Sequence, residues 1–140
     1  MIDMKTGDVH LDKGLVIKRQ MQKKEFIEAF LDEFMEPYKE NPMAETTFCL
    51  TPRVVEGVSV LVDVHYRDSD KIKTIEIYHE DDLYRYEYDK RKLSYEAMCE
   101  MLETIVRRDF ATSTRFHTWG SCEYGRDPRE GTASIVLRYY

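Results

Sequence analysis

The stretch at residues 58–66, VSVLVDVHY, limits the possible folds more than any other part of the chain. Successive side chains of a β-strand point to opposite faces of a sheet. Val60, Val62 and Val64 therefore share one face, while Asp63 and His65 lie on the other. An apolar face opposite a polar face predicts a half-buried strand.

The neighbouring segments predict further strands beside this one. Residues 67–70, RDSD, are typical of a turn, residues 74–79 alternate again, and residues 46–50, TTFCL, form another short strand. Residues 83–88, LYRYEY, also alternate, which places three tyrosines on one face. Together these segments predict an antiparallel meander.

Two other segments have helical periodicity. In residues 23–38, KKEFIEAFLDEFMEPY, acids lie mostly opposite an apolar stripe, and Pro37 is expected to end the helix. That stripe consists of Phe26, Ile27, Phe30, Leu31 and Phe34. The second helix follows Ser94, whose side chain is expected to cap it, and its buried stripe is Met98, Leu102, Ile105 and Val106. We expect both helices to pack on the sheet.

The two ends of the chain predict small strands joined by turns. Turns at residues 6–8 and 12–14 separate three short apolar pieces, and strands at about 115–124 and 132–139 enclose the loop GRDPREG. Trp119 is expected to belong to the core of this final hairpin. The fold class is α+β: one domain over residues 1–140, with a mainly antiparallel sheet of about six to eight strands packed by two α-helices.

Charge and cysteine usage restrict the classes of partner and the compartment. The formal net charge of −6 disfavours nucleic acid, whose binding needs clustered Lys and Arg. The first residues lack the basic and apolar parts of a signal peptide, and no apolar run is long enough to span a membrane. Cys49, Cys99 and Cys122 have no CxxC spacing, which indicates free thiols. We therefore expect a cytoplasmic protein that binds neither nucleic acid nor membrane.

No motif in the sequence indicates catalysis, a cofactor or a metal. The scattered glycines form no phosphate-binding loop, and the acids at residues 79–89 lack calcium-loop and HExxH spacing. His117 and Cys122 are five residues apart, an odd offset that on one regular strand directs them to opposite faces. We predict a protein that is not an enzyme, with no catalytic, cofactor or metal residues. The enzymatic alternative requires a pocket in which His79, His117 or a carboxyl group has a shifted pKa.

The tyrosines among acids near residue 80 are the candidate partner-binding surface. Tyr84, Tyr86 and Tyr88 share a strand face, so they are either packed together in the core, as aromatic strand faces usually are, or presented together. If they are exposed, the surrounding carboxylates would attract a basic partner. The predicted contact residues are Glu80, Asp81, Asp82, Tyr84, Tyr86, Glu87, Tyr88 and Asp89.

The two ends of the chain resemble those of a known group of proteins. The opening TGDVHLDKGLVIKRQMQKKEFIEAF and the close FHTWGSCEYGRDPREGTASIVLRY are similar in layout to small bacterial immunity proteins. These are encoded beside polymorphic or contact-dependent growth-inhibition toxins. The resemblance implies a non-enzymatic cytosolic protein that binds and blocks one cognate toxin, and the acidic charge would suit a cationic nuclease. The alternatives are a small enzyme of unrecognised type and a self-associating accessory domain, for which a homodimer is expected.

Overall fold

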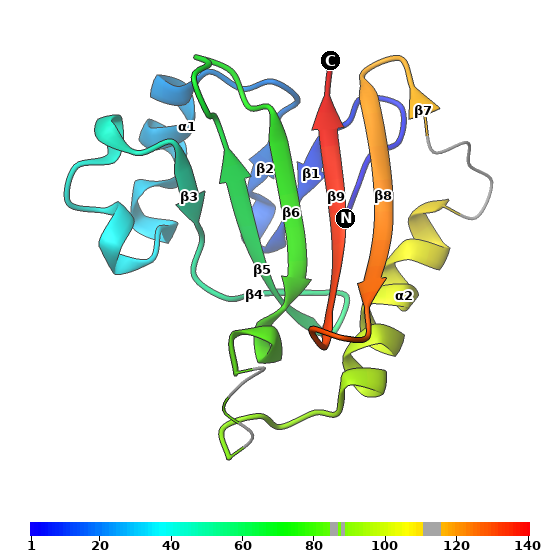
Figure 1. Ribbon diagram of the computed structural model, residues 1–140. Helices are drawn as coiled ribbons and strands as arrows, with labels where there is room; N and C mark the ends of the chain where they lie inside the picture. The colour runs from blue at the N-terminus through cyan, green and yellow to red at the C-terminus, as the bar shows by residue number, and fades with distance from the viewer. Residues whose placement is uncertain (85–86, 88, 111–115) are drawn as a thin grey trace.

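The computed structural model describes residues 1–84, 87, 89–110 and 116–140, and it shows an α+β domain with two sheets and two α-helices (Figure 1). The strands are β1 (Val9–His10), β2 (Val16–Ile17), β3 (Thr47–Cys49), β4 (Arg53–Val55), β5 (Val58–His65), β6 (Thr74–His79), β7 (Phe116–His117), β8 (Gly120–Asp127) and β9 (Thr132–Tyr139). The helices are α1 (Lys23–Phe30) and α2 (Tyr95–Phe110), and short 3₁₀ turns connect several of these elements. The predicted fold class is confirmed.

The main sheet has seven antiparallel strands in the order β3-β5-β6-β9-β8-β7, and β4 pairs with the start of β5. The register sets Phe48 opposite Val64 and Val62 opposite Ile77. The predicted strands around residues 46–50, 58–66 and 74–79 are confirmed by β3, β5 and β6, whereas β4 was not predicted. The last strand, β9, lies inside the sheet, between β6 and β8.

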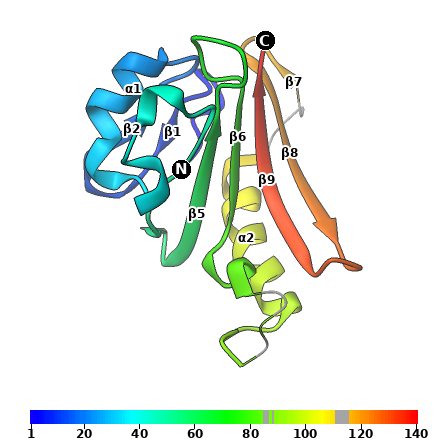
Figure 2. The ribbon, with the colours of Figure 1, turned by 60° about the vertical axis from the view of Figure 1, so that its left-hand side comes forward.

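One face of this sheet carries the core. Val60, Val62 and Val64 lie beside Ile77 and Ile135 and are all fully buried. The two helices and the β1–β2 hairpin lie on this side (Figures 1 and 2), and their apolar residues join the same cluster as the sheet residues. We call this side the packed face and the opposite side, over which neither helix lies, the open face.

Helix α1 is shorter than the sequence predicts. It ends at Phe30, and the prediction that Pro37 ends it is wrong, because Pro37 lies in a separate 3₁₀ turn at Glu36–Tyr38. Phe34 leaves the helical conformation and forms an isolated β-bridge with Leu50, which brings its ring against Phe48 at 4.8 Å between centroids. The helix therefore ends early because Phe34 packs beside the end of β3. Leu31, which was predicted to be buried, is exposed.

The second helix matches its prediction closely. The Ser94 hydroxyl oxygen accepts a hydrogen bond from the backbone N–H of Ala97 at 3.1 Å, which is the geometry of an N-cap. Met98, Leu102 and Ile105 are buried, and Val106 is half-buried against the core. Helix α2 contacts β9 and β6, as expected for a helix that covers the sheet.

The C-terminal strands differ from the predicted hairpin. A turn at Thr118 and Trp119 divides the first predicted strand into β7 and β8, and β8 continues to Asp127, so that only residues 128–131 form the loop. Gly120 permits this arrangement, since a Cβ atom there would lie 2.0 Å from the backbone oxygen of Arg138.

Trp119 is buried, as predicted, and it connects this hairpin to the N-terminal residues. Its Nε1–H donates to the backbone oxygen of Met4 at 2.9 Å, and its ring lies directly over Gly7. The intervening turn brings His117 and Cys122 to the same side of the sheet, because the two residues do not lie on one regular strand, the condition under which opposite faces were expected. Cys122 is fully buried, and the His117 ring stacks on Trp119 at 5.0 Å.

No helix among the residues that the structure describes combines the length and the apolar character needed to cross a bilayer.

Candidate partner-binding surfaces

The predicted acidic and tyrosine-rich segment begins at Glu80, directly after β6, at one end of the sheet (Figure 1). Its first residues form a 3₁₀ turn, Glu80–Tyr84, so the prediction of a strand is wrong at Leu83 and Tyr84. Tyr86 and Tyr88 lie outside the described residues, and the side chain of Tyr84 does as well. Glu87 and Asp89 are exposed. Whether the three tyrosines share a face therefore stays a prediction.

Asp81 explains why the chain turns here. Its side chain is only 5% exposed, and its carboxylate accepts hydrogen bonds from the backbone N–H groups of Lys92 and Leu93, the former at 2.9 Å. The Asp81 backbone N–H in turn donates to Nδ1 of His79 at 3.0 Å. Burial lowers the pKa of His79, although the nearby Asp81 and Glu80 charges act in the opposite direction. Asp81 thus fixes the entry to α2, and its carboxylate is already bonded within the chain.

Glu80 connects this segment to the open face of the sheet. The Ser59 hydroxyl, at the start of β5, donates to the Glu80 carboxylate at 2.6 Å. Asp82, next to Asp81, is half-buried.

A pocket of about 470 Å³ lies beside this segment and is lined by Ser59, His79, Glu80, Asp81, Lys90, Lys92 and Leu93. The enzymatic alternative asked for a pocket with a histidine of shifted pKa, and His79 meets that description. However, Nδ1 of His79 accepts a backbone N–H and the Ser59 hydroxyl pairs with a carboxylate, so the lining residues do not form a nucleophile–base pair.

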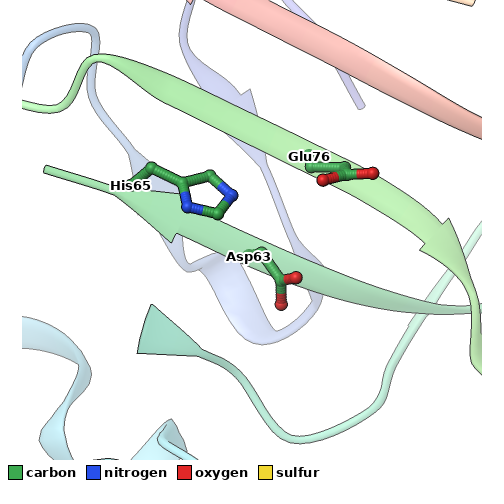
Figure 3. Close-up of side chains that lie close together, drawn as sticks. All are labelled: Asp63, His65 and Glu76. Carbon is green, nitrogen blue, oxygen red and sulfur yellow. The ribbon is translucent and has the colours of Figure 1, made fainter. Parts of the chain in front are cut away.

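The open face brings together a group that the sequence did not single out. Asp63 and His65 on β5 point to the same side as Glu76 on β6 (Figure 3). One ligand-type atom from each side chain lies within 4.8 Å of the others, and all three residues are half-buried. In the register, Asp63 is directly opposite Glu76. We call this group the central carboxylate site.

Its neighbours on the same face hold these side chains in place. The Tyr78 hydroxyl donates to the Asp63 carboxylate at 3.2 Å, and Thr47 Oγ1 lies 3.1 Å from Nδ1 of His65. Burial raises the pKa of Tyr78 above its usual range, and the Asp63 charge adds to this effect. Burial and a hydrogen bond with Asp63 raise the pKa of Cys49 to about 12, so this thiol stays protonated at neutral pH.

The chemistry of the central carboxylate site suits a cation. Two carboxylates and an imidazole are ligand types that divalent metals accept, and the same two carboxylates at this spacing suit the side chain of an arginine or lysine. Neither Asp63 nor Glu76 forms an ion pair with a lysine or arginine among the described residues. The sequence predicted no metal residues here.

The sequence contained part of the signal for this site. Alternation along residues 58–66 places Asp63 and His65 on the polar face, and alternation along 74–79 places Glu76 opposite its isoleucines. The missing information was the pairing of Asp63 with Glu76, which depends on the length of the turn between the strands.

Comparison with known proteins gives a match at the level of structure. No protein-family model matches the sequence, and neither does any curated protein. A solved structure described as "Rhs1-CT in complex with cognate immunity protein RhsI1" has a chain that is similar to this one with a TM-score of 0.58 and 15% sequence identity. The similarity covers 99% of this chain and 85% of that chain. At this identity the match shows a shared fold, and it agrees with the resemblance to immunity proteins that the sequence indicates.

Proposed function

We propose that this chain is an immunity protein, a non-enzymatic inhibitor that binds one cognate bacterial toxin domain in the cytoplasm and blocks its activity. The observation that carries the proposal is the similarity of nearly the whole chain to a chain in the complex of Rhs1-CT with its cognate immunity protein, RhsI1. A shared fold alone does not define a function. Here the shared fold agrees with the layout of the two ends of the sequence, which resembles that of immunity proteins.

The groups that line the pocket beside α2, as far as the structure describes them, are bonded within the chain. In the pocket beside α2, His79 and Asp81 bond to backbone N–H groups and thereby hold the chain between β6 and α2. Nδ1 of His79 and the Asp81 carboxylate oxygen that accepts these bonds are therefore occupied by the fold and do not serve as a proton acceptor for a substrate.

The first contact surface we propose is the predicted segment of Glu80, Asp81, Asp82, Tyr84, Tyr86, Glu87, Tyr88 and Asp89. Glu87 and Asp89 are exposed, so they can meet a partner directly. Asp81 takes part by fixing the backbone of the segment. Tyrosine offers a large contact area at low entropic cost, and the carboxylates attract a basic partner. A nuclease toxin, whose surface must be basic to bind phosphates, is the kind of partner that this charge suits.

The test is to co-express the tagged chain with the product of each adjacent gene and to measure binding by calorimetry and growth of the host. We expect a one-to-one complex of nanomolar affinity or tighter with a protein that is toxic when expressed alone. Growth should recover when this chain is present.

Two results would contradict the proposal. If no toxic neighbouring product binds this chain, the immunity function is wrong. If this chain itself stops growth, it is the toxin member of such a pair and the assignment is reversed. As a control, His79→Asn should still neutralise the toxin if neutralisation needs binding alone. If His79 were a catalytic residue, the same substitution would abolish neutralisation.

A further inference from the structure

Neither α-helix covers the open face of the main sheet. Leu61 and Cys49 on this face are buried, whereas Asp63, His65 and Glu76 are half-buried. In Figures 1 and 2 the helices and the small hairpin all lie on the packed face. The register places Asp63, Glu76 and Glu123 in one row across β5, β6, β9 and β8. Arg138 lies in the next row, where it forms an ion pair with Glu123 at 2.8 Å. The centre of this face therefore carries a net negative charge that is concentrated at Asp63 and Glu76.

An exposed aromatic residue marks one end of the same face. Phe116 on β7 is opposite Ser121, which is opposite Arg138, so its side chain lies on the open face. It is 71% exposed, the largest exposed fraction among the large apolar side chains that the structure describes. An exposed aromatic next to polar residues is the kind of residue that anchors protein–protein interfaces.

We propose that the toxin binds across the open face and places an arginine or lysine between Asp63 and Glu76. This inference rests on the proposed function and names the surface and the chemistry of its partner. The two carboxylates face each other from adjacent strands, and the Tyr78 hydroxyl donates to Asp63 from the side, which holds that carboxylate in position. A guanidinium that bridges two carboxylates forms charge-assisted hydrogen bonds with both. Phe116, on the edge strand β7, forms an apolar contact with the same toxin.

The area of the open face is smaller than the area that a specific complex buries on one partner. Four strands about 4.8 Å apart and about 25 Å long cover roughly 500 Å². A specific complex buries about 800 Å² on each partner, so the contact has to extend beyond the sheet. The hydrogen bond between Ser59 and Glu80 joins the open face to the 3₁₀ turn Glu80–Tyr84, where the acidic segment begins. One toxin domain can therefore contact both.

The experiment measures calorimetric affinity for the cognate toxin domain with variants of the full chain. Asp63→Asn together with Glu76→Gln removes both charges and keeps the oxygen that accepts the Tyr78 hydrogen bond. We expect a loss of about 10- to 100-fold in affinity and a weaker dependence on salt. Phe116→Ala should lose about tenfold or more. Glu28→Gln on α1 and Glu100→Gln on α2, both exposed on the helices of the packed side, are the matched controls and should bind like the wild type.

The outcomes separate this inference from the proposed function. If the wild type binds and neutralises a toxin but the open-face variants bind equally well, the toxin docks elsewhere and only this inference fails. If the wild type binds no toxin, the proposed function fails. If sedimentation shows a dimer of the wild type that Phe116→Ala dissociates, a second copy occupies the face and the toxin is the wrong occupant. Thermal unfolding of each variant shows whether a loss of affinity reflects the surface or the fold.

Discussion

The two faces of the main sheet are built from the same strands but differ in what they contribute. On the packed face, Phe48, Val62 and Ile77 are fully buried. On the open face, Asp63 and Glu76 are half-buried polar groups, and Asp63 accepts a hydrogen bond from the Tyr78 hydroxyl. We expect the apolar side chains of the packed face to account for most of the stability of the domain, and the carboxylates of Asp63 and Glu76 to add little to it. Substitutions that change the free energy of unfolding without changing partner affinity, or the reverse, test this difference between the faces.

The largest effect is expected from a phenylalanine on the packed face. Phe48 contacts Phe34, Phe26 and Tyr66 and is fully buried, so Phe48→Ala leaves a cavity. We expect the free energy of unfolding to fall by about 3 to 5 kcal/mol. The same substitution at the exposed Phe116 should change it by less than about 0.5 kcal/mol. Urea denaturation of both variants measures the losses, and equal losses would contradict the expected difference between the faces.

A smaller effect is expected where the acidic segment joins α2. Asp81→Ala removes the carboxylate that accepts the backbone N–H groups of Lys92 and Leu93. The free energy of unfolding should fall by about 2 kcal/mol, because both donors lose a charged acceptor. Asp89→Ala, at an exposed position of the same segment, should leave stability nearly unchanged. If both variants are equally stable, Asp81 does not have the structural role assigned to it.

The pH dependence of stability should show the contribution of His79. Because burial lowers the pKa of His79 in the folded state, the unfolded chain takes up the proton first as the pH falls below about 6.5. Protonation of Nδ1 would also break the hydrogen bond from Asp81. The free energy of unfolding should therefore decline as the pH falls, with a slope from this group of at most about 1.4 kcal/mol per pH unit.

His79→Asn keeps an acceptor for the Asp81 N–H but does not titrate. Its stability should decline less than that of the wild type between pH 7.5 and 5.5, measured by urea denaturation. Identical slopes in the two proteins would mean that His79 has no part in the pH dependence.

The smallest effect on stability is expected at the central carboxylate site. Asp63→Asn with Glu76→Gln should change the free energy of unfolding by less than about 0.5 kcal/mol, since neither carboxylate forms an ion pair in the described part of the chain. A large loss of stability would show that the open face contributes to the fold, and any change in toxin affinity would then need another explanation.

The sequence predicts some elements of the fold correctly and misses others. Alternation and helical periodicity are local signals, and they correctly predicted β5, β6 and α2 together with the Ser94 cap. The end of α1 was missed because it depends on a bridge between Phe34 and Leu50, and the division of the last hairpin was missed because it depends on contact between Gly120 and β9. These are contacts between distant residues, which a local pattern does not contain.

The candidate site was harder to predict than the fold. The acidic residues near position 80 stand out because they are consecutive, whereas Asp63 and Glu76 are 13 residues apart and meet only through strand pairing. The sequence therefore drew attention to the segment and not to the sheet face.

The position of β9 has a consequence for how the protein is made. Residues 132–139 fill the gap between β6 and β8, with Thr74 paired to Arg138, so the sheet closes only after the ribosome has released that part of the chain. Pairing between such distant segments is slow because a long loop must first be closed. Until then Ile75 and Ile77 lie on an unpaired strand edge, where chaperones and proteases compete with folding. The appearance of folded molecules should therefore lag behind their synthesis.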